Sequence, residues 1–558
     1  MTQPSNDKNR KPPRGRPVDP EALAEVRALL GEAPRRRDLL IEHLHKIQDK
    51  YRCLPAAHLV ALAEEMRMAP AEVYEVATFY HHFDVVKEGE TAPPPLTVRV
   101  CESITCAMFG SQALLDDLKR RLGARVRVKA VPCVGRCDGA PVAVVSTNPV
   151  DNATAAAVEM AVRSGAHHAA PPNPVTYSEY RRNGGYQTLV RCVRGELAAE
   201  DVVKTLEDSG LRGLGGAGFP AGRKWRILRE QPKPRMIAVN IDEGEPGTFK
   251  DRHYLERDPH RFFEGMLIAA WAIDCNSIYI YLRDEYTGLR QVLHNELETL
   301  KRNPPCPLPE TIELRRGAGA YICGEESAMI ESIEGKRGMP RLRPPYVAQV
   351  GLFGRPTLEH NMETLYWVRD IMEKGAQWFT ANGRNGRKGL RSFSVSGRVT
   401  KPGVHLAPAG ITVRELIDEY CGGMLPGHTF YGYFPGGASG GILPASMGDL
   451  PLDFDTLNPH GCFIGSAAVI IFSDRDLARL LALNAMRFFE DESCGQCTPC
   501  RVGTSKAAVL MDRKEWDFAL LEEIATTMAD ASICGLGQAA PNPLRCAIKY
   551  FPQEFKPE

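Results

Sequence analysis

The amino-acid sequence predicts a multidomain α/β protein, and three observations support that expectation. At 558 residues the chain is too long for one hydrophobic core, and at about 100–200 residues per domain it should form three to five domains. Apolar residues recur at helical spacing through residues 21–85. In residues 94–133, two apolar stretches typical of β-strands flank a helical pattern. Beyond these, apolar strands alternate with glycine-rich turns and amphipathic helices.

Charge and hydropathy exclude two classes of partner. The 69 basic and 69 acidic residues balance, so no net charge draws the chain to nucleic acid or a membrane surface. No apolar run approaches the ~20 residues of a membrane-spanning helix. An apolar signal segment is missing, and half of the sixteen cysteines have no paired spacing. We therefore expect a soluble protein of the reducing cytoplasm.

The N-terminal region begins with a basic, proline-rich stretch, KNRKPPRGRP. Such a composition favours a disordered arm, assigned to residues 1–30, which could also serve as a docking tail. Helical patterns follow in PEALAEVRALLGEA, RRDLLIEHLHKIQDKY and AAHLVALAEEMRM, and APAEVYEVATFYHHF closes the series.

The first cysteine group has the spacing C-x4-C and C-x3-C. A strand in PPPLTVRVCESITC ends at Cys101, with Cys106 close behind, and a strand in VRVKAVPC leads to Cys133 and Cys137. The segment ALLDDLKRRLGA between them is helical in pattern. Four thiolates at this spacing suit a [2Fe–2S] cluster, in which each iron takes two sulfurs.

The second cysteine group is C-x2-C-x2-C, formed by Cys494, Cys497 and Cys500. This run suits a [4Fe–4S] cluster whose fourth ligand comes from elsewhere in the chain. Cys534 in SICGLG is the best candidate, and Cys546 in the amphipathic RCAIKYF is its competitor. Tetrahedral zinc would also accept four cysteines, but C-x4-C with C-x3-C fits the paired C-x2-C pattern of a zinc knuckle poorly, and three evenly spaced cysteines fit it worse.

A glycine-rich segment opens the middle third, GLRGLGGAGFPAGRKW at residues 210–225. Gly213, Gly215 and Gly218 keep the G-x-G-x-x-G register, and Asp242 follows at about the distance of a dinucleotide-binding acid. A helical pattern precedes the glycines where a Rossmann fold needs a strand, and the FPAGRKW segment argues against a helix opening after them. We expect instead a cradle for an anion, with Lys224 adding positive charge; a flexible surface loop is the alternative.

Polar residues gather where the next apolar strand ends. The strand in RMIAVNIDEGEPGTFKDR carries Asn240, Asp242, Glu243 and Glu245, and its carboxylates need hydroxyls, water or a cation as partners. A second glycine-rich turn, GAGAYICGEES, leads into a helix near Gly324. Compensation of the helix dipole is the alternative explanation for the acids that follow it, Glu325 and Glu326.

Seven separated motifs together resemble a known family. VATFYHHF, GLRGLGGAGFPAGRKW, VNIDEGEPGTFKDR, GAGAYICGEES, PRLRPPY, HNMETL and SCGQCTPCR are similar to the flavoprotein subunit of the NADH dehydrogenase module of respiratory complex I and to its two-iron partner subunit. The two are joined here in one chain. Leu214, Ile227 and His360 depart from the residues usual in the family.

The resemblance implies a fold for each segment. The chain would begin with an N-terminal helical bundle at 31–87, followed by a thioredoxin-like [2Fe–2S] domain at 88–166 and a linker at 167–185. A complex I type FMN-binding α/β domain at 186–390, a ubiquitin-like β-grasp domain of SLBB type at 391–475 and a C-terminal helical [4Fe–4S] bundle at 476–558 complete it.

The resemblance also implies roles for individual residues. FMN would be held by Gly213, Gly215, Lys224, Asn240, Asp242, Glu243, Glu245, Tyr321, Gly324, Asn361 and Thr364. The nicotinamide nucleotide, NAD(H), would be received by Phe219, Glu325, Glu326, Arg343 and Tyr346. The eight cysteines above would hold the two clusters. No residue would need to act as a covalent catalyst, because hydride transfer needs only the alignment of NAD(H) on FMN.

Electron counting explains this set of cofactors. NADH gives two electrons at once, whereas an iron–sulfur cluster accepts one. A flavin between them can take up both electrons and pass them on one at a time. Another substrate must react on a separate partner chain. The fusion of the two parts, and the LEHNMETLYWVRDI segment, resemble the diaphorase (beta) subunit of a cytoplasmic NAD-dependent formate dehydrogenase with a Mo or W catalytic subunit. A NAD-reducing hydrogenase diaphorase, a complex I peripheral subunit and a non-enzymatic zinc-stabilised scaffold are the alternatives.

Overall fold

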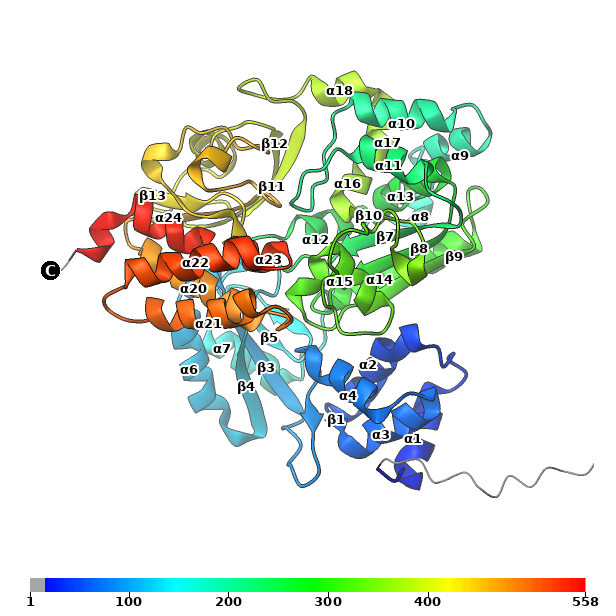
Figure 1. Ribbon diagram of the computed structural model, residues 1–558, viewed down its shortest axis with the longest axis horizontal. Coiled ribbons are helices and arrows are strands. Elements are labelled where there is room, and N and C mark those ends of the chain that lie inside the picture. The colour runs from blue at the N-terminus through cyan, green and yellow to red at the C-terminus, as the bar shows by residue number, and fades with distance from the viewer. Residues whose placement is uncertain (1–15, 557–558) are drawn as a thin grey trace, which may run out of the picture. The chain divides into compact units, whose positions relative to one another are not determined.

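The computed structural model describes residues 16–556 (Figure 1). The chain divides into two compact units. Of the described residues, the first comprises 16–93 with 335–337, and the second comprises 94–334 with 338–556.

The first unit is helical, as the sequence predicts. Its elements are α1 (Pro20–Leu30), α2 (Leu40–Tyr51), α3 (Ala56–Met66), α4 (Pro70–Phe79) and the short parallel strands β1 (Leu54–Pro55) and β2 (Val85–Val86). The assignment of residues 1–30 to a disordered arm is wrong for its second half, where α1 forms. Asp19 caps that helix by accepting a hydrogen bond from Glu21 N at 2.9 Å. Residues 1–15 of the arm lie outside the described residues.

The second unit begins with a four-stranded sheet in the order β4-β3-β5-β6. Its strands are β3 (Leu96–Cys101), β4 (Val126–Val131), β5 (Ala143–Val145) and β6 (Asn148–Val150), and its helices are α5 (Ile104–Met108), α6 (Ser111–Leu122) and α7 (Ala155–Ser164). β3 and β4 are parallel, and the other pairs are antiparallel. Val98, Val100, Leu118 and Val158 form the core between this sheet and its helices. The strands and the helix predicted around the first cysteine group are confirmed.

The expected linker at 167–185 is wrong in part, because α8 (Tyr177–Arg182) lies within it. Tyr177 and Tyr180 are buried. The Tyr180 hydroxyl donates to Glu264 Oε2 at 2.6 Å, and Tyr177 N donates to Glu296 Oε2 at 3.0 Å. The burial of these two aromatic side chains and the two hydrogen bonds stabilise a helix in a segment whose proline-rich composition had suggested a linker without secondary structure.

A parallel four-stranded sheet, ordered β10-β7-β8-β9, forms the middle of the second unit. Its strands are β7 (Arg235–Ile241), β8 (Cys275–Leu282), β9 (Thr311–Arg316) and β10 (Thr357–Asn361). The helices of this region are α9 (Gln187–Val193), α10 (Ala199–Asp208), α11 (Ala221–Arg229), α12 (Lys250–Leu255), α13 (Pro259–Ile273), α14 (Thr287–Arg302), α15 (Glu326–Ile333), α16 (Met362–Tyr366), α17 (Val368–Lys374) and α18 (Ala376–Thr380). Ile237, Ala238 and Val239 in the centre of β7 are fully buried, as expected for a strand of a covered parallel sheet.

The glycine-rich segment follows a helix, α10, as predicted, and not a strand. The argument against a helix after it is wrong, because α11 begins at Ala221. Pro220 lies at the N-cap, where its missing N–H removes no helical hydrogen bond.

The C-terminal part contains a mixed sheet, β12-β11-β15-β13-β14, and a helical region. The sheet region comprises β11 (Leu390–Gly397), β12 (Gly403–Pro408), α19 (Val413–Glu415), β13 (Phe430–Phe434), β14 (Leu443–Pro444) and β15 (Ala468–Ser473). The helices are α20 (Ala478–Asp491), α21 (Thr498–Met511), α22 (Phe518–Ala531), α23 (Gly535–Ala539) and α24 (Asn542–Tyr550). Within residues 16–556, each helix lacks the length or the apolar composition needed to cross a bilayer.

Candidate functional site

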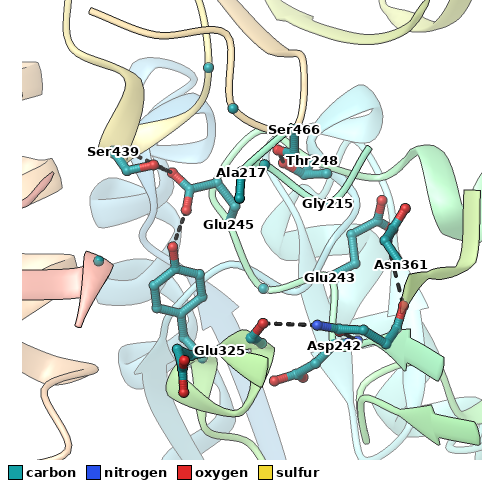
Figure 2. Close-up of a pocket in the computed structure, with 18 of the residues that line it drawn as sticks. Gly215, Ala217, Asp242, Glu243, Glu245, Thr248, Glu325, Asn361, Ser439 and Ser466 are labelled. Carbon is teal, nitrogen blue, oxygen red and sulfur yellow. Dashed lines mark hydrogen bonds between the residues drawn. The ribbon is translucent and has the colours of Figure 1, made fainter. Parts of the chain in front are cut away.

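A cavity of about 330 Å³ lies where β7 and β10 end (Figure 2). Ligands of parallel α/β sheets bind at this carboxyl edge of the strands. The glycine-rich segment, the loop after β7, the turn before α15, the mixed-sheet region and α23 all contribute to the wall. The lining includes nine of the predicted residues: Gly215, Asn240, Asp242, Glu243, Glu245, Tyr321, Gly324, Glu325 and Asn361.

Asn240 and Asp242 shape one wall of the cavity. Asn240 Nδ2 donates to Gly324 O at 2.8 Å, and Asp242 N donates to Asn240 Oδ1 at 3.0 Å. Among the described residues, Asp242 Oδ2 is a buried oxygen without a hydrogen-bond partner. Burial raises the pKa of Asp242 well above its ordinary value. Because Oδ2 has no partner within the described residues, this carboxyl group is available for a hydrogen bond with a hydroxyl of a bound molecule.

Glu243 and Glu245 are held by donors from different elements. Glu243 accepts from Asp251 N at 2.7 Å and from the Tyr286 hydroxyl at 2.8 Å. Burial, followed by the neighbouring Asp251, raises the pKa of Glu243 to about 7. Glu245 accepts from the Tyr321 hydroxyl, and from Ser439 N and Oγ at 2.7 and 2.8 Å.

The glycine-rich segment lines the cavity with backbone. A Cβ added at Gly215 would lie 3.0 Å from Asn361 Cβ, so a larger residue would crowd the wall. Gly213 does not line the cavity; its N–H donates to Phe219 O at 2.8 Å and closes the loop. Thr364 also holds this loop from outside the cavity, because Leu214 N donates to Thr364 Oγ1 at 2.9 Å. These two predicted residues support the cradle without lining it.

Lys224 and the predicted nucleotide-binding acids form a charged group beside the cavity. Lys224 Nζ lies 3.1 Å from Glu359 Oε2 and 3.6 Å from Glu326 Oε2. Burial opposes the charged form, but these two carboxylates outweigh it and raise the pKa of Lys224. Arg343 pairs with Glu325, and with Glu326 Oε1 at 3.2 Å. Among these residues, only Glu325 lines the cavity.

Two predicted aromatic residues lie at the surface. Phe219 is 41% exposed and Tyr346 is 55% exposed. Neither lines the cavity, and both rings are accessible for stacking against a ligand outside it. Glu325 lies just before the helix and not in its first turn as expected: its side chain accepts from Ser327 N and Ala328 N and caps α15.

Sequence reasoning missed Lys250 as a cavity residue. It is 1% exposed and pairs with Asp251 Oδ1 at 2.8 Å and Glu363 Oε2 at 3.0 Å. Asn361 joins the group by donating to Asp251 Oδ2 at 2.6 Å. The charged FKDR stretch directly after a glycine-rich loop was the available signal.

Residues of the C-terminal half were also missed. Gly436, Ser439, Phe463, Gly465, Ser466, Gly535, Leu536 and Ala539 complete the lining. Ser466 and Thr248 exchange a hydrogen bond of 2.7 Å across the cavity wall (Figure 2). The glycine-rich PGGASGG at residues 435–441 could have indicated a backbone near a ligand.

The four early cysteines lie together and are buried, with exposed fractions between 1% and 5%. Cys133 Sγ and Cys137 Sγ are 3.4 Å apart, and Cys101 lies within contact of Cys106 and Cys133. Phe249 packs against Cys133 and Cys137. Because Thr248 and Lys250 line the cavity, this cysteine cluster lies directly behind its wall.

The late cysteines also gather. Cys494, Cys497, Cys500 and Cys534 line one small cavity with Ile322 and Leu536. Cys546 lies elsewhere, with its sulfur 3.5 Å from Cys462 Sγ. Ile322 and Leu536 also line the large cavity, so the two cavities share a wall.

Comparison with known families gives four matches along the chain. Residues 26–165 match the thioredoxin-like [2Fe-2S] ferredoxin, and residues 206–370 match the Nuo51 FMN-binding domain. Residues 392–443 match the SLBB domain, and residues 480–558 match the NADH-ubiquinone oxidoreductase-F iron-sulfur binding region.

Curated relatives agree with these matches. An NADH-quinone oxidoreductase subunit of Rhizobium meliloti is 39% identical over 69% of this chain and 94% of its own length. The chain belongs to the NADH-quinone oxidoreductase flavoprotein family. The corresponding NADH-quinone oxidoreductase subunit of Aquifex aeolicus is likewise 39% identical over 69% of this chain and 92% of its own length. The mitochondrial NADH dehydrogenase [ubiquinone] flavoprotein 1 of Dictyostelium discoideum is 40% identical over 64% of this chain and 78% of its own length.

A solved structure covers nearly the whole chain. A chain of the NAD+-reducing [NiFe]-hydrogenase in the H2-reduced state superposes with a TM-score of 0.82 and 32% identity, covering 94% of this chain and 95% of that chain. The expected fold class, with thioredoxin-like, FMN-binding, SLBB and iron–sulfur parts, is confirmed for this member of the flavoprotein family. Its cofactors are FMN, a [2Fe–2S] and a [4Fe–4S] cluster, with NAD(H).

The cavity of this NADH-quinone oxidoreductase flavoprotein fits FMN. The unpartnered Asp242 oxygen and the amide of Asn240 suit a polyhydroxylated chain, and the backbone of Gly215–Ala217 allows close approach of a ligand. The two cysteine groups supply thiols alone, which suits iron–sulfur clusters.

Proposed function

We propose that this chain is a diaphorase subunit that exchanges hydride between NAD(H) and FMN and single electrons with two iron–sulfur clusters. The observation that carries the proposal is the shared wall. The cavity assigned to FMN borders the Cys494/Cys497/Cys500/Cys534 cavity through Ile322 and Leu536, and the early cysteines lie behind Phe249. Bound FMN would accept two electrons as hydride and release them singly.

The protein groups act by position. Asn240, Asp242 and Asn361 orient the flavin, and Gly215 admits it. Glu245 and Ser439 hold the mixed-sheet region against the loop after β7. No nucleophile or covalent intermediate is needed, because alignment and electrostatics supply the catalysis.

The charged group beside the cavity is assigned to the nicotinamide nucleotide. Glu326 and Arg343 form an ion pair next to Glu325, and Phe219 and Tyr346 expose their rings. Carboxylates accept hydrogen bonds from ribose hydroxyls, and aromatic rings stack on bases. This group and the two rings would therefore hold NAD(H) beside the cavity assigned to FMN.

The partner is proposed to be the Mo or W catalytic subunit of a cytoplasmic NAD-dependent formate dehydrogenase, which carries further clusters. The LEHNMETLYWVRDI segment supports this assignment. The fused architecture is compatible with it and with the hydrogenase below. The subunits would form a hetero-oligomer in which formate oxidation reduces NAD+, or CO2 is reduced in reverse.

A second candidate is the diaphorase of an NAD-reducing hydrogenase. The similarity to a solved chain of such an enzyme extends over 95% of that chain, and so includes the fusion of both parts. A complex I peripheral subunit is the third candidate, supported by the curated relatives.

Purification of the tagged chain from its native cell tests the partner. Mass spectrometry should identify a large co-purifying subunit, and metal analysis should find Mo or W. Stoichiometric Ni with a hydrogenase subunit would contradict the formate dehydrogenase assignment and support the second candidate.

A further inference from the structure

Two buried guanidinium groups hold the loop of the first cysteine cluster. Arg283 follows β8, and its Nη2 donates to Cys133 O at 2.7 Å. Arg252 lies on α12, and its Nε donates to Gly135 O at 3.1 Å. Both side chains belong to the region of the parallel sheet, whereas the loop belongs to the cysteine-bearing sheet.

Arg283 connects this loop with the wall of the large cavity. Its Nη1 donates to the carbonyl of Glu243, whose side chain lines that cavity. Its guanidinium also lies 5.2 Å from the ring centre of Tyr286, and Tyr286 donates to Glu243. One cation therefore contacts both the cluster loop and the cavity wall.

The charge of Arg283 is permanent and poorly screened. The side chain is 4% exposed, and a guanidinium keeps its proton in proteins. Its ion-pair partner, Glu285, lies 2.9 Å from Nη2 but is 31% exposed, so solvent weakens the compensating negative charge. Arg252, by contrast, is paired with both Asp138 and Glu256.

We propose that Arg283 is a positioning residue that sets the reduction potential of the [2Fe–2S] cluster through its charge and its bond to Cys133 O. The inference rests on the proposed function, which makes Cys101, Cys106, Cys133 and Cys137 the ligands. Reduction adds one electron, supplied by NADH through the flavin, and makes the cluster one unit more negative. No bond at Arg283 forms or breaks, and no proton moves. A buried positive charge stabilises that reduced state and raises the potential.

The test is a redox titration of the purified holoprotein, followed by the electron paramagnetic resonance signal of the reduced two-iron cluster. Arg283→Met should lower the ratio of reduced to oxidised cluster at fixed potential by about tenfold, which is about 59 mV for a one-electron couple. Arg283→Lys keeps the charge and should recover part of the shift. Glu285→Gln removes the opposing charge and should shift the potential in the opposite direction.

Arg235→Met is the matched control. Arg235 also donates to backbone carbonyls, Gln231 O and Ile273 O, but it begins β7. At about 3.3 Å per residue, Arg235 therefore lies roughly 20 Å from the other end of β7. That end leads to Glu243, whose carbonyl accepts from Arg283. This variant should change the ratio less than about twofold, since its charge is remote and screened.

The outcomes separate the two claims. Absence of a two-iron signal in the wild-type holoprotein would overturn the ligand assignment. An intact signal with an unchanged potential in Arg283→Met would overturn the role of Arg283 alone. If Arg283→Met assembles no cluster, Glu285→Gln decides: a raised potential supports the proposal, and an unchanged or lowered one overturns it.

Discussion

Tyr321 donates a hydrogen bond from its hydroxyl to the carboxylate of Glu245, which also accepts from Ser439. This relationship joins the turn before α15, the loop after β7 and the mixed-sheet region around one cavity. The three elements are far apart in sequence, and this carboxylate is one point at which they meet.

Replacement of Glu245 by Ala should weaken this junction. Ser439 N–H and the Tyr321 hydroxyl would lose their acceptor, which costs about 1–3 kcal/mol for buried donors. We expect a lower thermal midpoint and faster release of FMN, measured by the rise in flavin fluorescence. Tyr321→Phe removes only one of the bonds and should have the smaller effect; equal flavin retention in all three proteins would contradict the role of Glu245.

Replacement of Cys534 by Ala should remove the four-iron signal in electron paramagnetic resonance. Its sulfur lines the same cavity as Cys494, Cys497 and Cys500. Cys546→Ala is the control, because Cys546 contacts Cys462 instead. A four-iron signal that survives in Cys534→Ala and disappears in Cys546→Ala would show that the fourth ligand is misassigned.

Replacement of Glu326 by Ala should weaken NADH binding and leave the flavin in place. Glu326 lies in the charged group with Lys224 and Arg343 and does not line the large cavity. Loss of a hydrogen bond to a charged acceptor predicts a roughly tenfold higher dissociation constant. Glu298→Ala, which removes a half-exposed acid on α14 that pairs with Lys301, should not change NADH binding. Unchanged NADH affinity in Glu326→Ala would exclude this role.

The carboxyl group of Glu243 should make stability fall as pH rises. Burial raises its pKa from 4.5 to about 7, so between these values the folded state keeps a proton that the unfolded state has released. Its contribution is therefore fully present below about pH 4.5 and lost through pH 7, by up to roughly 3 kcal/mol.

Glu243→Gln should remove this decline. The difference in thermal midpoint between about pH 5 and about pH 8 should be smaller in the variant than in the wild type. An identical pH dependence in both proteins would show that Glu243 does not contribute to it.

Local patterns predicted much of the fold. The strands β3, β4 and β7 and the helix α6 follow from hydrophobic periodicity and from cysteines placed at strand ends, whereas the late helical region was expected from the family resemblance. Two elements contradict the expectations. α8 depends on the burial of Tyr177 and Tyr180 against distant acids, and α11 begins at Pro220–Ala221, where proline appeared to break a helix.

The site was predictable where its residues share one strand end or one motif. Asn240, Asp242, Glu243 and Glu245 follow β7 directly, and the structure brings them to one cavity. Ser439 and Ser466 come from a different sheet, so only tertiary packing reveals them. Lys224 was expected to add charge to the cavity, but two carboxylates hold it beside the cavity instead.

The most direct test of the account is the visible spectrum of the purified chain before and after anaerobic addition of NADH. The account predicts bound FMN and iron, bleaching of the flavin band by NADH, and the appearance of signals from reduced [4Fe–4S] and [2Fe–2S] clusters. A colourless chain that holds zinc and no FMN would contradict it and would indicate a zinc-stabilised scaffold.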